Sequence, residues 1–223
     1  NGNHWLANTA MDGAVVWFEG PETVDLSLQD NIFEDHNTAT SLIALTAKQC
    51  IVHASNNTHT NNTHASGYLW INAMNYTYLV SNGDQINQPA GNWLWLSVDE
   101  LDNLIYYNQT VEITDLTAHF TTTSSPTPWH LIHMAGTTDG QQSLSLLNVS
   151  ITASLDTSEA TLVTMTCNEA VTQQLSVTDS LISNIRGGVF DLAGTTSSNQ
   201  SVSFRNTTMK QVSTLDSSSA LKL

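Results

Sequence analysis

The sequence predicts an all-β fold in which parallel strands wind into a solenoid of about seven to eight coils. The first observation is a shared pattern in TVEITDLTAHF, SLSLLNVSI, QLSVTDSLI and SVSFRNTTM, which start at Thr110, Ser143, Gln174 and Ser201. The second is the interval of about 26 to 33 residues between repeats, which lies in the range of solenoids. The third is the absence of helical periodicity between the repeats. These observations predict one stacked body over residues 1–223, a mature product or a segment of a longer chain.

Each repeat contains one Asp or Asn that we take as its anchor. The anchors are Asp30, Asn56, Asn82, Asp115, Asn148, Asp179 and Asn206. At a tight corner such a side chain can satisfy unpaired backbone groups, tolerates left-handed geometry and can bond to the same residue in the next coil. The other interpretation, that the Asp members are metal ligands or acid–base groups, is the weaker one.

A strand precedes each anchor, and its alternating apolar residues indicate one buried face. The predicted inward pairs are Leu26 and Leu28, Val52 and Ala54, Tyr78 and Val80, Val111 and Ile113, Leu144 and Leu146, Leu175 and Val177, and Val202 and Phe204. Three residues after the anchor an apolar residue usually returns, at Phe33, Ala118, Ile151, Ile182 and Met209. His59 and Gln85 interrupt this column, so the second and third coils are expected to be irregular there.

A second strand is expected to close each coil after a variable loop. Its inward pairs are Val16 and Phe18, Ile43 and Leu45, Leu69 and Ile71, Leu94 and Leu96, Ile132 and Met134, Val163 and Met165, Phe190 and Leu192, and Leu221 and Leu223. Strands buried between neighbouring coils favour Val, Ile, Leu and Phe, which are the residues found.

Composition excludes several classes of protein. With 5 Lys and Arg against 20 Asp and Glu, the net charge of −15 argues against binding nucleic acid or anionic membranes. No apolar run reaches the roughly 18 residues needed for a membrane span. A soluble surface of Ser, Thr and Asn indicates a secreted or cell-surface protein. Cys50 and Cys167 fall several coils apart, so both are expected to be buried free thiols.

The chain is rich in N-x-S/T sequons, though not far beyond chance for this composition. Asn61, Asn75, Asn108 and Asn199 lie near predicted turns and are the candidates for N-glycosylation. The three anchors that are also sequons, Asn56, Asn148 and Asn206, are expected to be too buried for modification.

The units VSFRNTTM, LSVTDSLISN and LSLLNVSI, with GGVFDL as a closing strand, resemble the right-handed parallel β-helix of the pectate-lyase-like superfamily. The resemblance extends from Val15 to Leu223 and is nearest to large extracellular surface and adhesin proteins of microbes. It implies the fold and handedness but no particular activity, because the superfamily includes lyases, hydrolases, epimerases, adhesins and inert filaments.

The residue between each inward pair of the closing strands should point outward. This outward column reads Trp17, Ala44, Trp70, Trp95, His133, Thr164, Asp191 and Lys222. An aromatic row of this kind can stack against sugar rings, with Glu19, Thr46, Asn72, Ser97 and Thr166 beside it for hydroxyl groups. The alternative, which we favour, is that the row contacts protein, either a neighbouring subunit or a loop such as residues 99–107.

The sequence offers few residues that could act together as a catalytic site. A glycoside hydrolase needs two carboxylates across one bond, yet Asp191 has only the remote Glu19 as a partner. A lyase would have to rely on Arg186, Arg205 or Lys222 near Asp191. Parity places His130 and His133 on opposite faces of a strand, and His59 and His64 lie in a loop, so no metal site is expected. We therefore expect no catalytic residue, metal or cofactor.

The sequence thus favours an extracellular structural glycoprotein that self-associates, end to end or laterally, into a filament, surface layer or adhesive stalk. The last strand, ALKL, carries no polar cap, which favours stacking of ends. The alternative is a β-helix that binds or cleaves carbohydrate through its Trp row.

Overall fold

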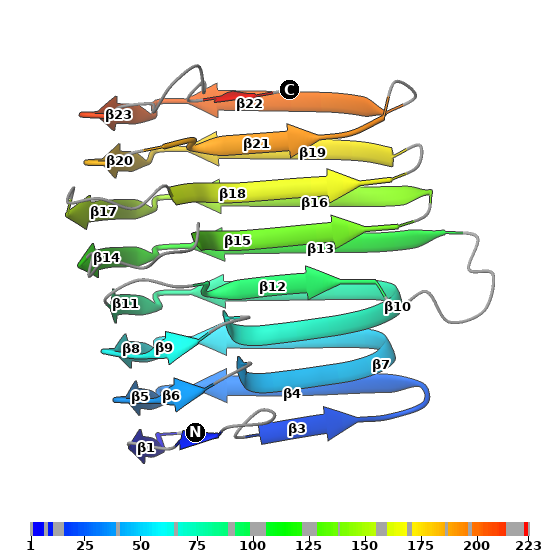
Figure 1. Cartoon of the computed structure of the whole chain (residues 1–223), viewed down its shortest axis with the longest axis vertical. Coiled ribbons are helices and arrows are strands. Elements are labelled where there is room, and N and C mark those ends of the chain that lie inside the picture. The colour runs from blue at the N-terminus through cyan, green and yellow to red at the C-terminus, as the bar shows by residue number, and fades with distance from the viewer. Residues whose placement is uncertain are drawn as a thin grey trace.

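The structure is a computed structural model of the chain. It describes residues 2–6, 9–10, 16–38, 41–64, 67–88, 92–98, 106–121, 129–137, 139–154, 160–168, 171–185, 187–195, 198–212 and 221–222. Every strand pair in this part of the chain is parallel, and none of these residues is helical. Figure 1 shows the strands stacked as successive coils, with the N-terminus at one end and the C-terminus at the other. The fold is a parallel β-solenoid, as the sequence predicts.

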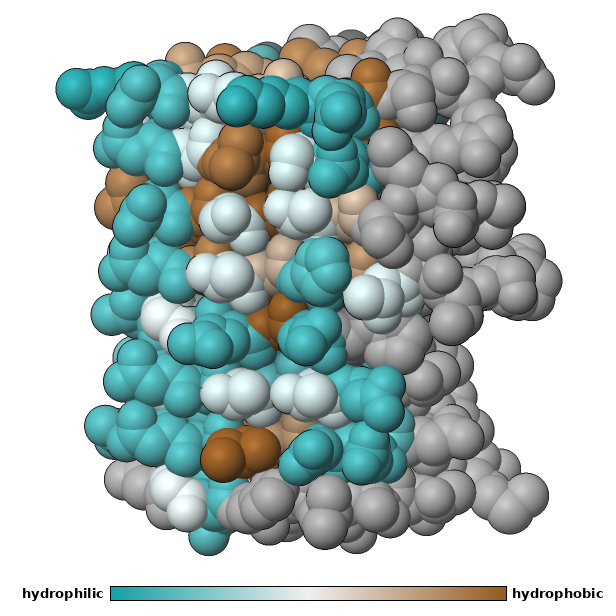
Figure 2. Space-filling view, turned by 90° about the vertical axis from the view of Figure 1, so that its left-hand side faces the viewer, coloured by the Kyte–Doolittle hydropathy of each residue, from teal (hydrophilic) through white to brown (hydrophobic). Residues whose placement is uncertain are grey.

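One wall of the solenoid is an eight-stranded sheet that receives one short strand from each full or partial coil. In stacking order its strands are β1 (His4–Leu6), β5 (Ile32–Glu34), β8 (Thr58–Thr60), β11 (Gln85–Gln88), β14 (Thr117–Thr121), β17 (Ser150–Ser154), β20 (Leu181–Ser183) and β23 (Thr208–Lys210). Figure 2 shows that, on the side of the molecule seen there, hydrophilic and intermediate residues cover much of the coloured surface, with hydrophobic residues between them.

The other walls belong to one thirteen-stranded sheet that bends around a corner. Its long row contains β4 (Thr23–Gln29), β7 (Ser41–Ser55), β10 (Gly67–Asn82), β13 (Tyr107–Thr114), β16 (Gly140–Leu147), β19 (Val171–Thr178) and β22 (Asn199–Arg205). Its closing row contains β3 (Val16–Glu19), the first halves of β7 and β10, and β12 (Leu94–Ser97), β15 (Trp129–Gly136), β18 (Ala160–Cys167), β21 (Phe190–Ala193) and β24 (Leu221–Lys222). A small three-stranded sheet adds β2 (Thr9–Ala10), β6 (Asn37–Thr38) and β9 (Thr63–His64).

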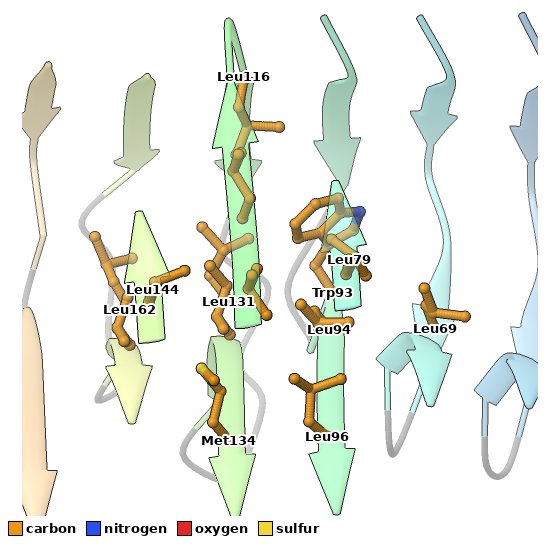
Figure 3. Close-up of a cluster of buried hydrophobic side chains, with 14 of the residues drawn as sticks. Leu69, Leu79, Trp93, Leu94, Leu96, Leu116, Leu131, Met134, Leu144 and Leu162 are labelled. Atoms are coloured by element: carbon orange, nitrogen blue, oxygen red, sulfur yellow. The ribbon is translucent and has the colours of Figure 1, made fainter. Parts of the chain in front are cut away.

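The stack makes about six turns, slightly fewer than the seven to eight coils expected. Counting closing strands overestimates the number, because the terminal strands belong to partial coils. Inside the stack, most inward positions form apolar columns. Leu94 and Leu96 of β12 pack against neighbouring coils, and Met134 of β15 follows Leu96 in register (Figure 3). One continuous core therefore runs between the walls.

The third coil corrects the predicted register by one residue. Leu79 and Ser81 are buried and point inward, whereas Tyr78 and Val80 point outward. The corner is made by Gly83 at φ 71°, not by Asn82, which remains in β10. The amide of Gly83 donates to the carbonyl of Thr114, as the anchors do in the other coils. Counted from Gly83, Ile86 fills the third position and is buried, so Gln85 interrupts nothing.

His59 does occupy the apolar column, and the structure packs it there. Its ring is buried and stacks on Phe33 with centroids 5.2 Å apart and planes 4° apart. Tyr68 meets the same imidazole edge-on at 4.1 Å. An imidazole thus replaces an aliphatic side chain without disturbing the registers of β5, β8 and β11.

The remaining anchors lie at left-handed corners. Asp30, Asn56, Asp115, Asn148, Asp179 and Asn206 have φ between 50° and 56°. Their side chains bond in pairs along the axis: Asn56 Nδ2 donates to Asp30 Oδ1, and Asn206 Nδ2 donates to Asp179 Oδ1 at 2.7 Å. Asn148 and Asp115 form the equivalent pair. Positive φ is costly for most side chains and least so for Asn and Asp, so the corner explains the residue type.

Two buried polar ladders were not foreseen. In the first coils, the residue after the anchor is polar, and Asn31, Asn57 and Asp84 bond successively through their side chains. In the later coils, a different column carries Gln109, Gln142, Gln173 and Gln200, each amide donating to the preceding glutamine at 2.8–3.0 Å.

Candidate functional site

The candidate site is the outward column of the closing row, which is the column named from the sequence. Strand registers place Trp17 beside Ala44, then Trp70, Trp95, His133, Thr164, Asp191 and Lys222 in unbroken order. The column therefore runs almost the full length of the solenoid. In Figure 1 the strands that carry its later members, β12, β15, β18 and β21, lie in front of the long row.

The first part of the column is a pair of indoles across a small residue. Trp17 and Trp70 are two coils apart, and Ala44 between them is fully buried. The two rings meet edge-to-face with centroids 6.0 Å apart. Trp17 is 51% exposed and Trp70 partly exposed, so this pair forms an apolar ridge that solvent reaches.

The middle of the column is a stack of an indole and an imidazole. Trp95 and His133 are partly buried, with ring centroids 4.0 Å apart and planes 22° apart. His130 lies on the same side, its ring 5.3 Å from that of His133, which corrects the prediction that the two histidines face opposite ways. Parity fails here because Leu131 and Ile132 are both fully buried and the register with β18 skips Leu131.

The last part of the column is polar. Thr164 Oγ1 and His130 Nδ1 form a hydrogen bond of 2.8 Å, and the backbone amide of His130 donates to Asn92 Oδ1. Lys222 Nζ lies 3.6 Å from Asp191 Oδ2, a partly exposed ion pair of small energetic weight.

The environment makes both histidines weak bases. Burial lowers the pKa of His133 to about 4, and the neighbouring His130 contributes to the same shift. Burial also lowers the pKa of His130, against opposing effects of the Thr161 backbone and of Asp191. At neutral pH both imidazoles are therefore uncharged, and the aromatic part of the column presents no cation.

The two acids on this wall are far apart. Glu19 lies six coils from Asp191, and at about 4.8 Å per coil this is roughly 29 Å. Glycosidase carboxylates flank one bond at about 5–10 Å, so these two cannot act as such a pair. Beside the column, Ser97 Oγ donates to Asn72 Oδ1 at 3.1 Å, which supplies the neighbouring row of polar groups.

The predicted glycosylation sites differ in their surroundings. Asn75 is exposed in a bulge of β10, and Asn199 is exposed at the start of β22. Asn108 is half-buried, and its Oδ1 accepts a hydrogen bond from Thr110. Asn61 is exposed but occupies a second left-handed corner at φ 57°, where its Nδ2 donates to Asp35 Oδ1 at 2.8 Å.

The anchor sequons correct a second expectation. Asn56, Asn148 and Asn206 are exposed rather than too buried. Their side-chain amides are instead engaged in hydrogen bonds, since each Nδ2 donates to the Asp that is the preceding anchor. Within the described residues, no group of three or more His, Cys, Asp or Glu side chains could hold a metal ion.

Several other features bear on function. Cys50 and Cys167 are buried free thiols. No helix among the described residues is long and apolar enough to cross a membrane. Residues 99–105 of the apolar loop, and Arg186, lie outside the described part of the chain.

Comparison with known proteins finds no matching family model, no similar curated protein and no similar solved structure. The fold and the chemistry of the outward column therefore carry the functional argument.

Proposed function

We propose that this protein is an extracellular structural glycoprotein, a stiff β-solenoid that self-associates into a filament, surface layer or adhesive stalk. The observation that carries the proposal is continuity along the axis. Strand ladders and the apolar core repeat from coil to coil, and the anchor pairs add bonds between some neighbouring coils. A body in which each coil is bonded to the next resists bending and presents long flat walls.

Charge distribution supports association along the axis. The first 35 residues carry Asp12, Glu19, Glu22, Asp25, Asp30, Glu34 and Asp35 and no Lys or Arg. Arg205, Lys210 and Lys222, three of the five basic residues, lie on the last described strands and are exposed. Opposite charge at the two ends favours head-to-tail contact between copies, which is a heterologous contact that builds filaments.

Exposed apolar side chains are also found at the two ends of the solenoid. Trp17 and Phe18 are 51% and 41% exposed on the first coil, and Phe204 and Met209 are 40% and 38% exposed on the last described one. In the middle of the stack the inward positions equivalent to Phe18, Phe204 and Met209 are buried, as Leu146 and Ile151 illustrate. The exposed sequon Asn75, together with the Ser, Thr and Asn-rich composition, supports an extracellular, glycosylated protein.

Light scattering at graded protein concentration, in low and high salt, tests the association. We expect the mass to rise with concentration and to fall as salt screens the charges. The double variant R205Q/K210Q should associate at least tenfold more weakly. Its control is Q141E/Q174E, which changes net charge equally but places the change on outward positions of β16 and β19, strands that have a further strand on each side. Equal weakening by both variants, or a monomer under all conditions, would overturn the proposal.

A second candidate function is carbohydrate binding on the outward column, which the partly exposed Trp17, Trp70 and Trp95 favour. It would fit the right-handed, pectate-lyase-like arrangement that the repeat units resemble. If this candidate holds, Trp70→Ala should remove binding to a neutral polysaccharide in an affinity gel, while Tyr78→Ala on the long row should not. Unchanged retardation of the Trp70 variant eliminates this candidate.

A further inference from the structure

We propose that His130, His133 and Trp95 form an acid-sensitive latch that closes the middle of the outward column at neutral pH and releases the Trp95 ring in acid. The latch is a device of this wall of the solenoid and is independent of how copies associate.

The latch is built by stacking across two coils. Trp95 on β12 and His133 on β15 are register partners, and their rings stack at 4.0 Å. His130 precedes them at the start of β15 and lies 5.3 Å from His133. Its position is fixed from two sides, by Asn92 at the backbone amide and by Thr164 at Nδ1.

A proton on Nδ1 of His133 would find no acceptor among the described residues. This nitrogen is buried and has no hydrogen-bond partner there. The register neighbours, Trp95 on β12 and Thr164 on β18, carry no charge. The nearest carboxylate in the column is Asp191 on β21, two coils away, and its Oδ2 faces Lys222.

Protonation of His133 would therefore place a cation in a partly buried site, and protonation of His130 as well would place a second cation 5.3 Å from it. The pKa of His133, about 4, lies below its ordinary value of 6.5 because burial disfavours the charged form. The unfolded or opened state therefore binds the proton more readily than the closed state does. As a result, the closed state is favoured above pH 6.5 and loses stability as pH falls toward 4.

Opening relieves the conflict by letting water reach His133. The same movement separates the imidazole from the indole and exposes Trp95 beside Trp70 in the column. Acid would thus lengthen the exposed aromatic row, while the apolar core on the inward side of β12 and β15 stays in place. The imidazole of His119, on β14 of the eight-stranded sheet, is exposed and lies outside the column.

Tryptophan fluorescence between pH 7.5 and 4 tests the latch on the folded chain. We expect a reversible red shift with its midpoint between pH 4 and 6.5, absent in Trp95→Phe. His133→Phe, which keeps the stack without a titratable ring, should abolish the pH dependence. The control His119→Gln should keep it. A transition that persists in His133→Phe, or a wild type with none, would overturn the proposal.

A second measurement needs no variant. The NMR signals of the imidazole ring of His133 report its protonation directly in the wild-type protein. A midpoint well below 6.5 that coincides with the fluorescence change is the expected result. A midpoint near 6.5, with Trp95 unaffected, would show that the stacked ring accepts its proton without opening and would contradict the latch.

Discussion

The two halves of the solenoid have their buried polar ladders at different corners. The asparagine ladder of the first half lies at the corner after the anchor, and the glutamine ladder of the second half lies at the corner between the closing and long rows. Up to Asp84, the polar column follows the anchor, where Asn57 Nδ2 donates to the carbonyl of Leu28 and to Asp84. From Tyr107 onward, Leu116 and Val149 occupy that corner in two coils, and the last two coils place the hydroxyls of Ser180 and Thr207 there. In these later coils the buried ladder is that of the glutamines, at the other corner.

The two halves also differ in whether a strand runs unbroken through the corner between the closing and long rows. In the first half, β7 and β10 pass through the second corner as single strands of 15 and 16 residues, so their backbones stay paired, with one bulge. The column there is Val24, Cys50 and Thr77. In the second half the rows are separate strands joined by loops, which leaves carbonyls at the ends of the closing strands.

The glutamine ladder supplies the missing donors. Gln142, Gln173 and Gln200 each donate to the carbonyl eight residues earlier, on Met134, Met165 and Leu192. Those three carbonyls are register partners on β15, β18 and β21. From β13 onward, the glutamine column thus accompanies the breaks between the closing and long rows, whereas Cys50 and Thr77 lie where β7 and β10 run through this corner.

The largest effect is expected from breaking the glutamine ladder. Gln173→Leu removes the donors to Gln142 and Met165 and the acceptor for Gln200, and leaves buried groups unpaired. Unfolding in urea should show a loss of about 2–4 kcal/mol. The adjacent, exposed Gln174→Leu is the matched control and should stay within about 0.5 kcal/mol of wild type. Equal losses in the two variants would remove the ladder from the account.

A smaller effect is expected where the asparagine ladder ends at Asp84. Burial raises the pKa of this carboxyl, although hydrogen bonds from Ser81 and Asn57 oppose the shift. Asp84→Ala leaves the amide and side chain of Asn57 without an acceptor and should cost about 1–3 kcal/mol. Asp84→Asn keeps an acceptor and loses the charge.

The sign of the pH dependence follows from the raised pKa. The protonated carboxyl is favoured in the folded state, so its contribution is complete below the ordinary value of 3.8 and is lost as pH rises. The stability of wild type relative to Asp84→Asn should therefore fall between pH 4 and 7, as measured by urea unfolding at each pH. A constant difference would show that Asp84 is not destabilised by its burial.

The smallest expected effect is a gain in stability at the corner through which β7 and β10 run as single strands. Thr77 Oγ1 is buried and has no hydrogen-bond partner among the described residues. Thr77→Val keeps the shape and should raise the free energy of unfolding by about 1 kcal/mol. Thr110→Val, at a partly exposed hydroxyl that donates to Asn108, should give no gain. A loss in the Thr77 variant would indicate that the hydroxyl is paired.

Much of the fold was predictable because its repeat is encoded in side-chain chemistry at fixed positions. The anchors, the apolar pairs before them and the outward column all follow from that repeat. The third coil was misread by one residue because Gly83 makes its corner without an Asp or Asn. A glutamine six residues before Asp115, Asn148, Asp179 and Asn206 was visible in the sequence as well, and it marks the second ladder.

The site was less predictable because it depends on local irregularity. Alternation could not show that Leu131 and Ile132 are both buried, which brings His130 to the side of His133. The ion pair of Asp191 with Lys222 and the bond between Thr164 and His130 also depend on stacking distances that spacing alone does not provide.

The two halves also differ in charge, with acids on the first coils and bases on the last described ones, and this difference underlies the proposed assembly. Negative-stain electron microscopy of the purified protein, in low salt and at the concentrations used for light scattering, tests that claim most directly. The account predicts filaments, or sheets of filaments, in which the solenoid axes are aligned head to tail. Discrete single particles throughout the concentration range would contradict it.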